Sequence, residues 1–230
     1  MSNDHWADLN QRIIACRLCP RLTAYREQVA HEKKRAYRDQ EYWGRPVPGF
    51  GDHTARALVV GLAPGAHGSN RTGRMFTGDA SGVFLYRALH HAGFASRPGS
   101  DHRDDDLVLK DIFITAICRC APPDNKPTRE EEANCRPYLL EEMALLDRLE
   151  GIVALGRIAL DGIRAAYQER DITIPRIDFG HNREFELGQG LPWLVTSYHP
   201  SRQNTQTGRL TEADFDAVWT RVRGLLCGVG

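Results

Sequence analysis

The chain has 230 residues, of which 41% are hydrophobic and 26% are charged, which is enough for one α/β domain with a buried core. Thirty basic residues balance thirty acidic ones, so the net charge points to no class of partner, although local basic stretches could still hold a phosphate backbone. Residues 1–10 are polar and no apolar run approaches the length of a membrane span. We therefore expect a cytoplasmic protein with no signal peptide and no membrane association.

The apolar pattern predicts the elements in chain order. Helical spacing of Leu9, Ile13 and Ile14 predicts a helix that ends near Cys16, and a basic, tyrosine-containing stretch follows to about Gln40. Four short apolar runs predict buried strands at Ala57–Gly61, 112–117, 152–155 and 194–197. Helical patterns lie between and after them at 82–92, 129–148, 157–166 and 213–226. Thr128 with Glu131, and Thr211 with Asp214, have the spacing of helix-capping pairs.

Alternation of strands and helices predicts the fold class. We expect an α/β fold, a single domain over residues 1–230, with a central, mainly parallel four-stranded sheet and helices on both faces. In such a sheet all the segments that follow the strands meet at the carboxyl edge, where open α/β folds bind their ligands. These segments carry the unusual residues of the chain, so they predict one site.

Two pairs of cysteines predict a metal site. Cys16 and Cys19 form a C-x2-C step, and Cys120 and Cys135 follow about a hundred residues later. Four thiolates suit zinc or an iron–sulfur cluster, and the long, uneven spacing favours a cluster. Such a site would tie the amino-terminal segment to the rest of the domain. Cys118, two residues before Cys120, could ligate instead, and reduced structural thiols are the simpler alternative.

The segment after the first strand is rich in glycine. Six glycines lie between Gly61 and Gly82, without the lysine of a phosphate-binding Walker loop, so the backbone N–H groups are the expected ligand-binding groups. Phe76 could stack on a planar ring while Asp79 acts on it. Taken singly, each residue is explained more simply, Phe76 by core packing and Asp79 by an N-cap of the following helix.

The segment after the last strand carries a candidate catalytic histidine. His199 stands between an apolar strand and Pro200, and a structural histidine is the equal alternative. The polar run 201–209 suits contact with a phosphate backbone, or is an ordinary solvated loop.

Together these segments resemble the uracil-DNA glycosylase superfamily, and most closely its family 5, the iron–sulfur, thermophile-type branch. The resemblance spans nearly the whole chain in order, through residues 16–21, 45–51, 61–74, 76–82, 120–127, 154–157 and 197–211. It implies a monofunctional DNA glycosylase of base excision repair. Such an enzyme flips a deaminated base out of DNA and hydrolyses its N-glycosidic bond, which leaves an abasic site.

The resemblance also implies roles for individual residues. It implies a 4Fe–4S cluster on Cys16, Cys19, Cys120 and Cys135, with Cys120 taken in place of Cys118. It implies that Phe76 stacks on the base, that His199 donates to the base oxygen, and that Asp79 stabilises the cationic sugar or positions water, with Asn125 orienting substrate or water. The remaining substrate-binding residues would be Gly61, Ala63, Pro64, Gly65 and Asn204, and the DNA-contacting residues Arg71, Arg202, Gln206 and Arg209.

Two departures from the wider superfamily predict relaxed specificity. Ala66 and Ala116 stand where other members carry polar side chains, so no side-chain amide is left unpaired by the wrong base. We therefore expect uracil, hypoxanthine and xanthine as substrates, in double-stranded DNA, and a monomeric enzyme. The rival interpretations are a metal-stapled nucleic-acid-binding module without catalysis, and a nucleotide or phosphate-ester hydrolase.

Overall fold

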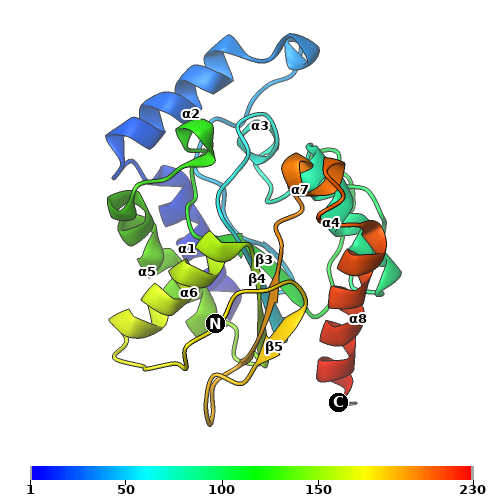
Figure 1. The fold of residues 1–230 in the computed structure, drawn as a ribbon. Coiled ribbons are helices and arrows are strands. Elements are labelled where there is room, and N and C mark those ends of the chain that lie inside the picture. The colour runs from blue at the N-terminus through cyan, green and yellow to red at the C-terminus, as the bar shows by residue number, and fades with distance from the viewer. Residues whose placement is uncertain (1, 229–230) are drawn as a thin grey trace.

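A mostly parallel sheet forms the centre of the fold (Figure 1), and the computed structural model describes residues 2–228. Four inner strands run parallel in the order β3-β2-β4-β6. Their bounds are β2 (Ala57–Gly61), β3 (Ile112–Ala116), β4 (Gly151–Leu155) and β6 (Trp193–Ser197). These strands match the predicted ones almost residue for residue, because strands buried on both faces have continuous apolar sequences.

The predicted number of four strands is wrong, because the sheet has six. A short strand pairs antiparallel at each edge, β1 (Phe50–Gly51) with β3, and β5 (Arg183–Phe185) with β6. Both are too short to show an alternating pattern, and β5 carries two exposed charged residues, as edge strands often do.

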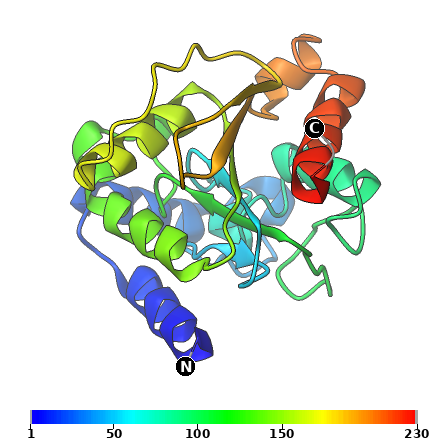
Figure 2. The ribbon, with the colours of Figure 1, turned by 90° about the horizontal axis from the view of Figure 1, so that it is seen from below.

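Helices cover both faces of the sheet, as predicted. One face packs against α1 (Ser2–Ala15), α5 (Arg129–Leu145) and α6 (Arg157–Glu169). The other packs against α4 (Ala80–His91) and α8 (Glu212–Cys227). Seen from below, α1 and α8 lie on opposite sides of the molecule (Figure 2). The capping boxes predicted at Thr128 and Thr211 are both present.

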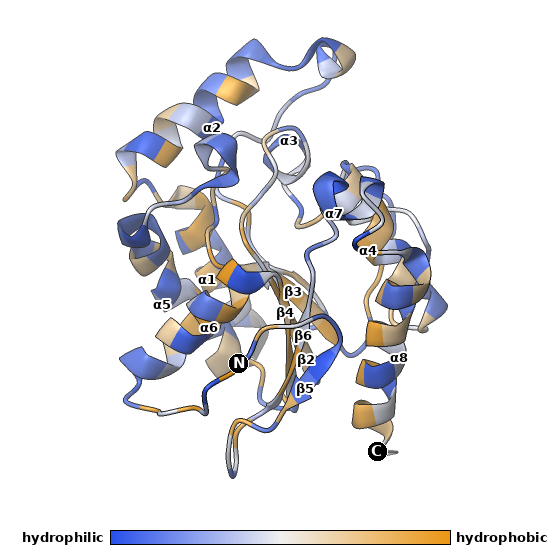
Figure 3. Ribbon diagram, in the orientation of Figure 1, coloured by the Kyte–Doolittle hydropathy of each residue, from blue (hydrophilic) through white to orange (hydrophobic). Residues whose placement is uncertain are grey.

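Figure 3 shows the central strands mostly in hydrophobic colours, between helices of mixed hydropathy. Successive side chains of β2 enter different cores, with Val59 on the α4–α8 side and Leu58 and Val60 on the α1–α5–α6 side. Among residues 2–228 no helix is both long enough and apolar enough to cross a bilayer.

The sequence did not predict α2 (Pro20–Glu32), which fills most of the basic stretch. Pro20 occupies the first turn, where its missing N–H costs nothing. The buried positions of α2 include Thr23 and Arg26 beside Leu22 and Val29, so the helix lacks a clear apolar stripe. Four further short helical segments also went unpredicted: α3 (Ser69–Thr72), α7 (Arg202–Gln206), and the 3-10 turns η1 (Arg35–Tyr37) and η2 (Pro123–Asn125).

A buried ion pair joins the segment after β3 to α5. The Arg119 guanidinium donates to both carboxylate oxygens of Glu142, at 2.9 and 2.6 Å, and the two side chains are 1% and 0% exposed. Arg119 lies between Cys118 and Cys120, and α5 carries Cys135. This buried pair therefore fixes the distance between the segment that carries Cys118 and Cys120 and the helix that carries Cys135.

We expect Glu142→Ala to lower the free energy of unfolding by about 3–5 kcal/mol, because it leaves a buried guanidinium without its counter-ion. The neighbouring Glu141 pairs with Arg12 at the surface, so Glu141→Ala should cost less than about 1 kcal/mol. Urea denaturation of both variants measures the difference. Equal losses in the two would contradict the structural role of the buried pair.

Candidate active site

A cavity of about 800 Å³ opens at the carboxyl edge of the parallel strands. The segments that follow β2, β3 and β6 all line it, as the predicted topology requires. Seven predicted site residues meet here: Ala63, Gly65, Phe76, Asp79, Asn125, His199 and Arg202. Residues more than a hundred positions apart in the chain thus share one cavity.

The two carboxylate oxygens of Asp79 have different surroundings. Oδ1 accepts the backbone N–H of Gly82 at 3.0 Å and so caps α4, which bears out the N-cap interpretation. Oδ2 lies against the glycine-rich loop, where a Cβ at Gly68 would come within 2.0 Å of it and one at Gly65 within 2.8 Å. Burial raises the pKa of Asp79, while the N–H groups of Gly82 and Ser81 oppose that shift. The cap therefore aims a desolvated carboxylate into the cavity.

Phe76 has a left-handed backbone, with φ of 51°, which is rare for an aromatic residue. Its ring lies 5.7 Å from the His199 ring at an interplanar angle of 29°. A Cβ at Gly61 would come within 2.9 Å of the ring, and one at Gly82 within 1.7 Å of the Phe76 carbonyl oxygen. Two glycines thus make room for a strained turn, and such strain concentrates at functional sites.

His199 follows β6 and lies beside Phe76. Burial lowers its pKa to about 4, so its ring is neutral at neutral pH. The Asn204 side chain donates to the His199 carbonyl oxygen at 2.8 Å. Asn204 thus supports the histidine from α7 and does not itself line the cavity. A neutral imidazole keeps one N–H group, through which it can donate a hydrogen bond to an oxygen that gains negative charge.

Several predicted site residues lie outside the cavity lining. Gly61 packs beneath Phe76 and Pro64 is buried. Arg71 is largely buried, and its guanidinium donates to the carbonyls of His67 and Gly78 and to Gln40. That bonding braces the glycine-rich loop, and it differs from the predicted role in contacting DNA. Gln206 is exposed, and the Arg209 guanidinium stacks on Tyr198 at 4.4 Å.

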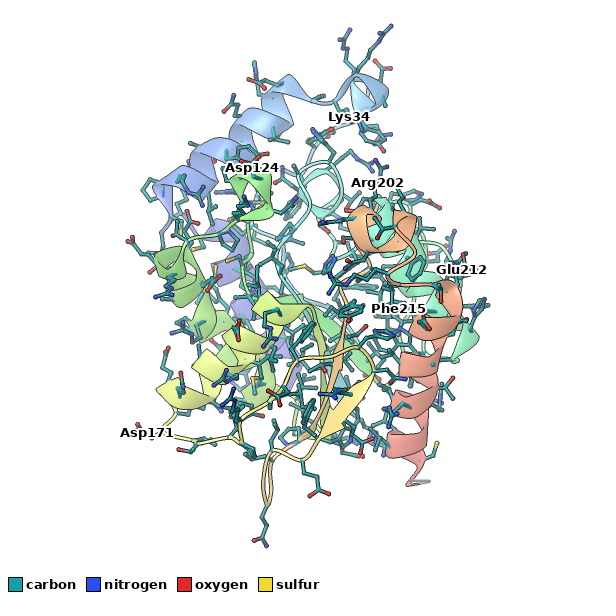
Figure 4. All side chains as sticks on the ribbon, viewed as in Figure 1. Lys34, Asp124, Asp171, Arg202, Glu212 and Phe215 are labelled. Atoms are coloured by element: carbon teal, nitrogen blue, oxygen red, sulfur yellow. The ribbon has the colours of Figure 1, made fainter. Side chains whose placement is uncertain are left out.

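The opposite wall of the cavity was not predicted. Tyr25 lies on α2, Lys34 is the N-cap of η1 and Tyr37 ends η1. His67 comes from the glycine-rich loop and Asp124 from η2. Figure 4 labels Lys34, Asp124 and Arg202 on three different segments around this end of the molecule. No sequence pattern shows that the basic stretch up to about Gln40 folds over the edge of the sheet. Its positive charge was the one sequence feature that could have indicated a place in a binding site.

Comparison with known proteins decides the family. The sequence model of the uracil DNA glycosylase superfamily matches residues 48–223. The chain belongs to the uracil-DNA glycosylase superfamily. A type-5 uracil-DNA glycosylase from Thermus thermophilus is 55% identical over 215 residues, which cover 94% of this chain and 95% of the relative. A type-5 relative from Mycobacterium bovis is 49% identical over 220 residues, 95% of this chain and 81% of the relative.

A more distant relative supports the same family assignment. A type-4 uracil-DNA glycosylase from Archaeoglobus fulgidus is 30% identical over 224 residues, 96% of this chain and 92% of the relative. The higher identity to type-5 relatives confirms the family 5 resemblance. The superfamily assignment confirms the predicted enzyme class, a hydrolase that acts on N-glycosyl bonds.

The predicted cysteine ligands gather near one another on the α1–α5–α6 side. Cys120 and Cys135 are buried, and Cys16 and Cys19 are half-buried at the start of α2. Burial raises the pKa of Cys120 to about 12, and the charges of Cys135, Cys16 and Cys19 add to that shift. Cys120 is therefore within electrostatic reach of all three other predicted ligands. Cys118 hydrogen-bonds to Cys135, which raises the pKa of Cys118.

The surroundings of these cysteines suit an anionic iron–sulfur cluster. The Asn134 side chain donates to Cys19 Sγ at 3.5 Å, and the backbone N–H of Arg119 donates to Cys135. The buried Arg26 guanidinium acts on Cys120, and its Nε has no partner. Within residues 2–228 no three metal-ligating side chains converge on a single ion. A four-iron cluster makes no such demand, because each cysteine ligates a different iron.

We expect the His199 ring to titrate near pH 4, well below its ordinary value of about 6.5, because it is desolvated. Between these values the unfolded chain binds a proton that the folded chain does not, so stability falls as pH drops from 6.5 towards 4. NMR titration of the ring, and urea denaturation at pH 7 and pH 5, measure this. In His199→Gln the free energy of unfolding should decrease less between pH 7 and pH 5 than in the parent protein. Titration of the ring near pH 6.5 would contradict the prediction, because it would show that the ring is exposed to solvent.

Proposed function

We propose that this protein is a monofunctional DNA glycosylase of base excision repair. It flips uracil out of DNA and hydrolyses the N-glycosidic bond, which leaves an abasic site. The observation that carries the proposal is the convergence of Phe76, Asp79 and His199 in one cavity at the carboxyl edge of the sheet, in a chain of this superfamily. We further propose that it acts as a cytoplasmic monomer on double-stranded DNA.

Each of these residues fits one requirement of the reaction. A base must leave the stack before its glycosidic bond can be reached, and the Phe76 ring offers a face on which the flipped base stacks. Bond cleavage puts negative charge on the base and positive charge on the sugar. His199, neutral at working pH, would donate to the base oxygen, and such a donor is worth about 3–4 kcal/mol.

Asp79 would stabilise the cationic sugar. Its helix cap and the close glycine backbone hold the carboxylate in a fixed position, so little reorganisation is needed when the positive charge develops. Asn125, which lines the same cavity, would orient the attacking water or the substrate. Backbone groups of residues 61–65 would bind the polar edge of the base, and water completes hydrolysis without a covalent bond to the protein.

Relaxed base specificity is supported by Ala116. This residue ends β3 and pairs in register with Gly61, next to the base-binding loop, and its side chain is buried. A methyl group at this position makes no hydrogen bond to the Watson–Crick edge. Hypoxanthine and xanthine therefore leave no buried amide unpaired, and we propose them as further substrates.

We propose that Cys16, Cys19, Cys120 and Cys135 hold a 4Fe–4S cluster with a structural role. When bound, the cluster ties α2 to the segment after β3 and to α5. Because α2 carries Tyr25 of the cavity wall, the cluster helps to fix the cavity without taking part in hydrolysis. By analogy with covalent staples, closing a loop of about a hundred residues is worth several kcal/mol.

We expect release of uracil, and of hypoxanthine, from duplexes that carry one such lesion, because the cavity holds a flipped base next to Asp79 and His199. His199→Ala should slow release at least a hundredfold, in proportion to the loss of one preorganised donor. Alkaline cleavage of the abasic product measures the rate, and a duplex without a lesion is the control. Binding without base release by an intact protein would favour a non-catalytic binding module.

We expect Cys16→Ala to bleach the brown absorbance and to lower the melting temperature, because it removes one cluster ligand. Cys118→Ala should keep the iron, since Cys118 is not one of the four proposed ligands. The exposed Cys227 at the end of α8 gives a matched control, and Cys227→Ala should keep both colour and stability. Iron content and calorimetry measure these outcomes. Unchanged iron in Cys16→Ala would contradict the ligand set.

A further inference from the structure

The wall of the cavity formed by η1 and the glycine-rich loop carries a histidine that the reaction does not use. His67 lines the cavity together with Lys34, and its ring is half-buried. It stands one residue before Gly68, against which the Asp79 carboxylate packs, so it lies close to the group that acts on the sugar.

A hydrogen-bond chain reaches the His67 ring through Tyr42. The backbone N–H of Lys34 donates to the Tyr42 hydroxyl oxygen at 3.2 Å. The Tyr42 hydroxyl lies 3.1 Å from His67 Nδ1, and it can donate its proton there while it accepts from Lys34. When Tyr42 donates to Nδ1, Nε2 carries the ring proton and can donate a hydrogen bond. Tyr42 is buried, which keeps this arrangement fixed.

His67 acts as a neutral donor next to a cation. Burial and the positive charges of Lys34 and Arg71 lower the pKa of His67, so the ring carries no charge at neutral pH. Lys34 itself is exposed, and its ammonium is close enough for its charge to act on the ring. Arg71 completes the support, because its Nε donates to the His67 carbonyl at 2.8 Å.

We propose that Lys34 and His67 form a phosphate-binding site that holds the DNA backbone next to the flipped nucleotide. The proposal rests on the glycosylase function and names the part of the substrate that this wall contacts. The ammonium of Lys34 would attract the phosphodiester by its charge, and the ring N–H of His67 would orient it through a directional hydrogen bond. A sugar placed at Asp79 carries its phosphates only a few bonds away, within reach of the neighbouring His67.

The charges elsewhere around the cavity agree with this orientation. Arg202 lies on α7, and its charge acts on Asp79, whereas Asp124 lies on η2. The charge of Arg202 is thus offset in part by Asp79, whereas Lys34 stands on a third segment (Figure 4) and is the other cation that lines the cavity. The wall with Lys34 and His67 is therefore a favourable side for the backbone, and the carboxylate side suits the cationic sugar.

The test measures binding to a duplex that carries 2′-fluoro-2′-deoxyuridine, whose glycosidic bond resists hydrolysis, at several salt concentrations. We expect Lys34→Ala to weaken binding about tenfold and to reduce the salt slope by about 0.9, as for one phosphate contact. His67→Ala should weaken binding about fivefold with an unchanged slope, because the lost donor is neutral. Tyr42→Phe should give a smaller loss, because it removes the hydrogen bonds of the hydroxyl to the Lys34 backbone and the His67 ring but leaves both phosphate-binding side chains in place.

Replacing one phosphodiester of the DNA by an uncharged methylphosphonate identifies the phosphate that Lys34 contacts. A methylphosphonate on either side of the lesion should weaken binding of the parent protein at one of the two positions, and should weaken Lys34→Ala much less there. Lys110 is exposed and lies just before β3, at the opposite edge of the sheet, so Lys110→Ala is the matched control and should bind as the parent does.

The two proposals fail in different ways. Equal methylphosphonate losses in the parent and in Lys34→Ala, or unchanged affinity in both Lys34→Ala and His67→Ala, would overturn the phosphate site. Slower base release by His67→Ala with unchanged binding would also overturn it, because the histidine would then act on the chemistry. Failure of the parent protein to release uracil from any duplex would instead overturn the glycosylase function.

Discussion

The candidate active site depends on the way the Asp79 side chain is held. One carboxylate oxygen caps α4 and the other lies against Gly65 and Gly68, so the first turn of the helix and the glycine-rich loop fix the same side chain. The cap places negative charge at the positive end of a helix, which favours the ionised form. Burial opposes ionisation, and the balance leaves a carboxylate that is held in place but only weakly solvated. A group in this state responds strongly to positive charge that appears beside it.

Burial acts in opposite directions on two groups that line the cavity, Asp79 and His199. It raises the pKa of Asp79 and lowers that of His199, since in each case it disfavours the charged form. The histidine is then a neutral donor rather than a cation. The same physics keeps His67 neutral on the opposite wall, where its Nδ1 lies 3.1 Å from the Tyr42 hydroxyl. The cavity thus offers directed hydrogen bonds with little fixed positive charge, apart from Lys34 and Arg202 near its rim.

The amino-terminal segment completes the site from outside the sheet. α2 begins directly after Cys19 and supplies Tyr25, while η1 follows it and supplies Tyr37 beside Lys34. Arg26, on the same helix, is buried next to the cysteines and donates to the Gly44 carbonyl at 3.0 Å. A structural change at the predicted cysteine ligands can therefore reach the cavity wall through a single helix, α2.

The sequence by itself determined the four inner strands, the helices between them and the edge of the sheet where their loops meet. Continuous apolar runs and helical spacing are patterns within short stretches of sequence, so they can be recognised without the tertiary structure. It also placed Asp79 as a cap, and the motifs of residues 61–82 and 197–211 carried the family resemblance. The tertiary structure alone decided that Asp79 serves as cap and site residue together, and that Arg71 braces a loop. It also decided that α2 and η1 form a cavity wall. The inward face of α2 carries Arg26, whose burial is offset by backbone carbonyls from distant segments, so no local pattern could have revealed it.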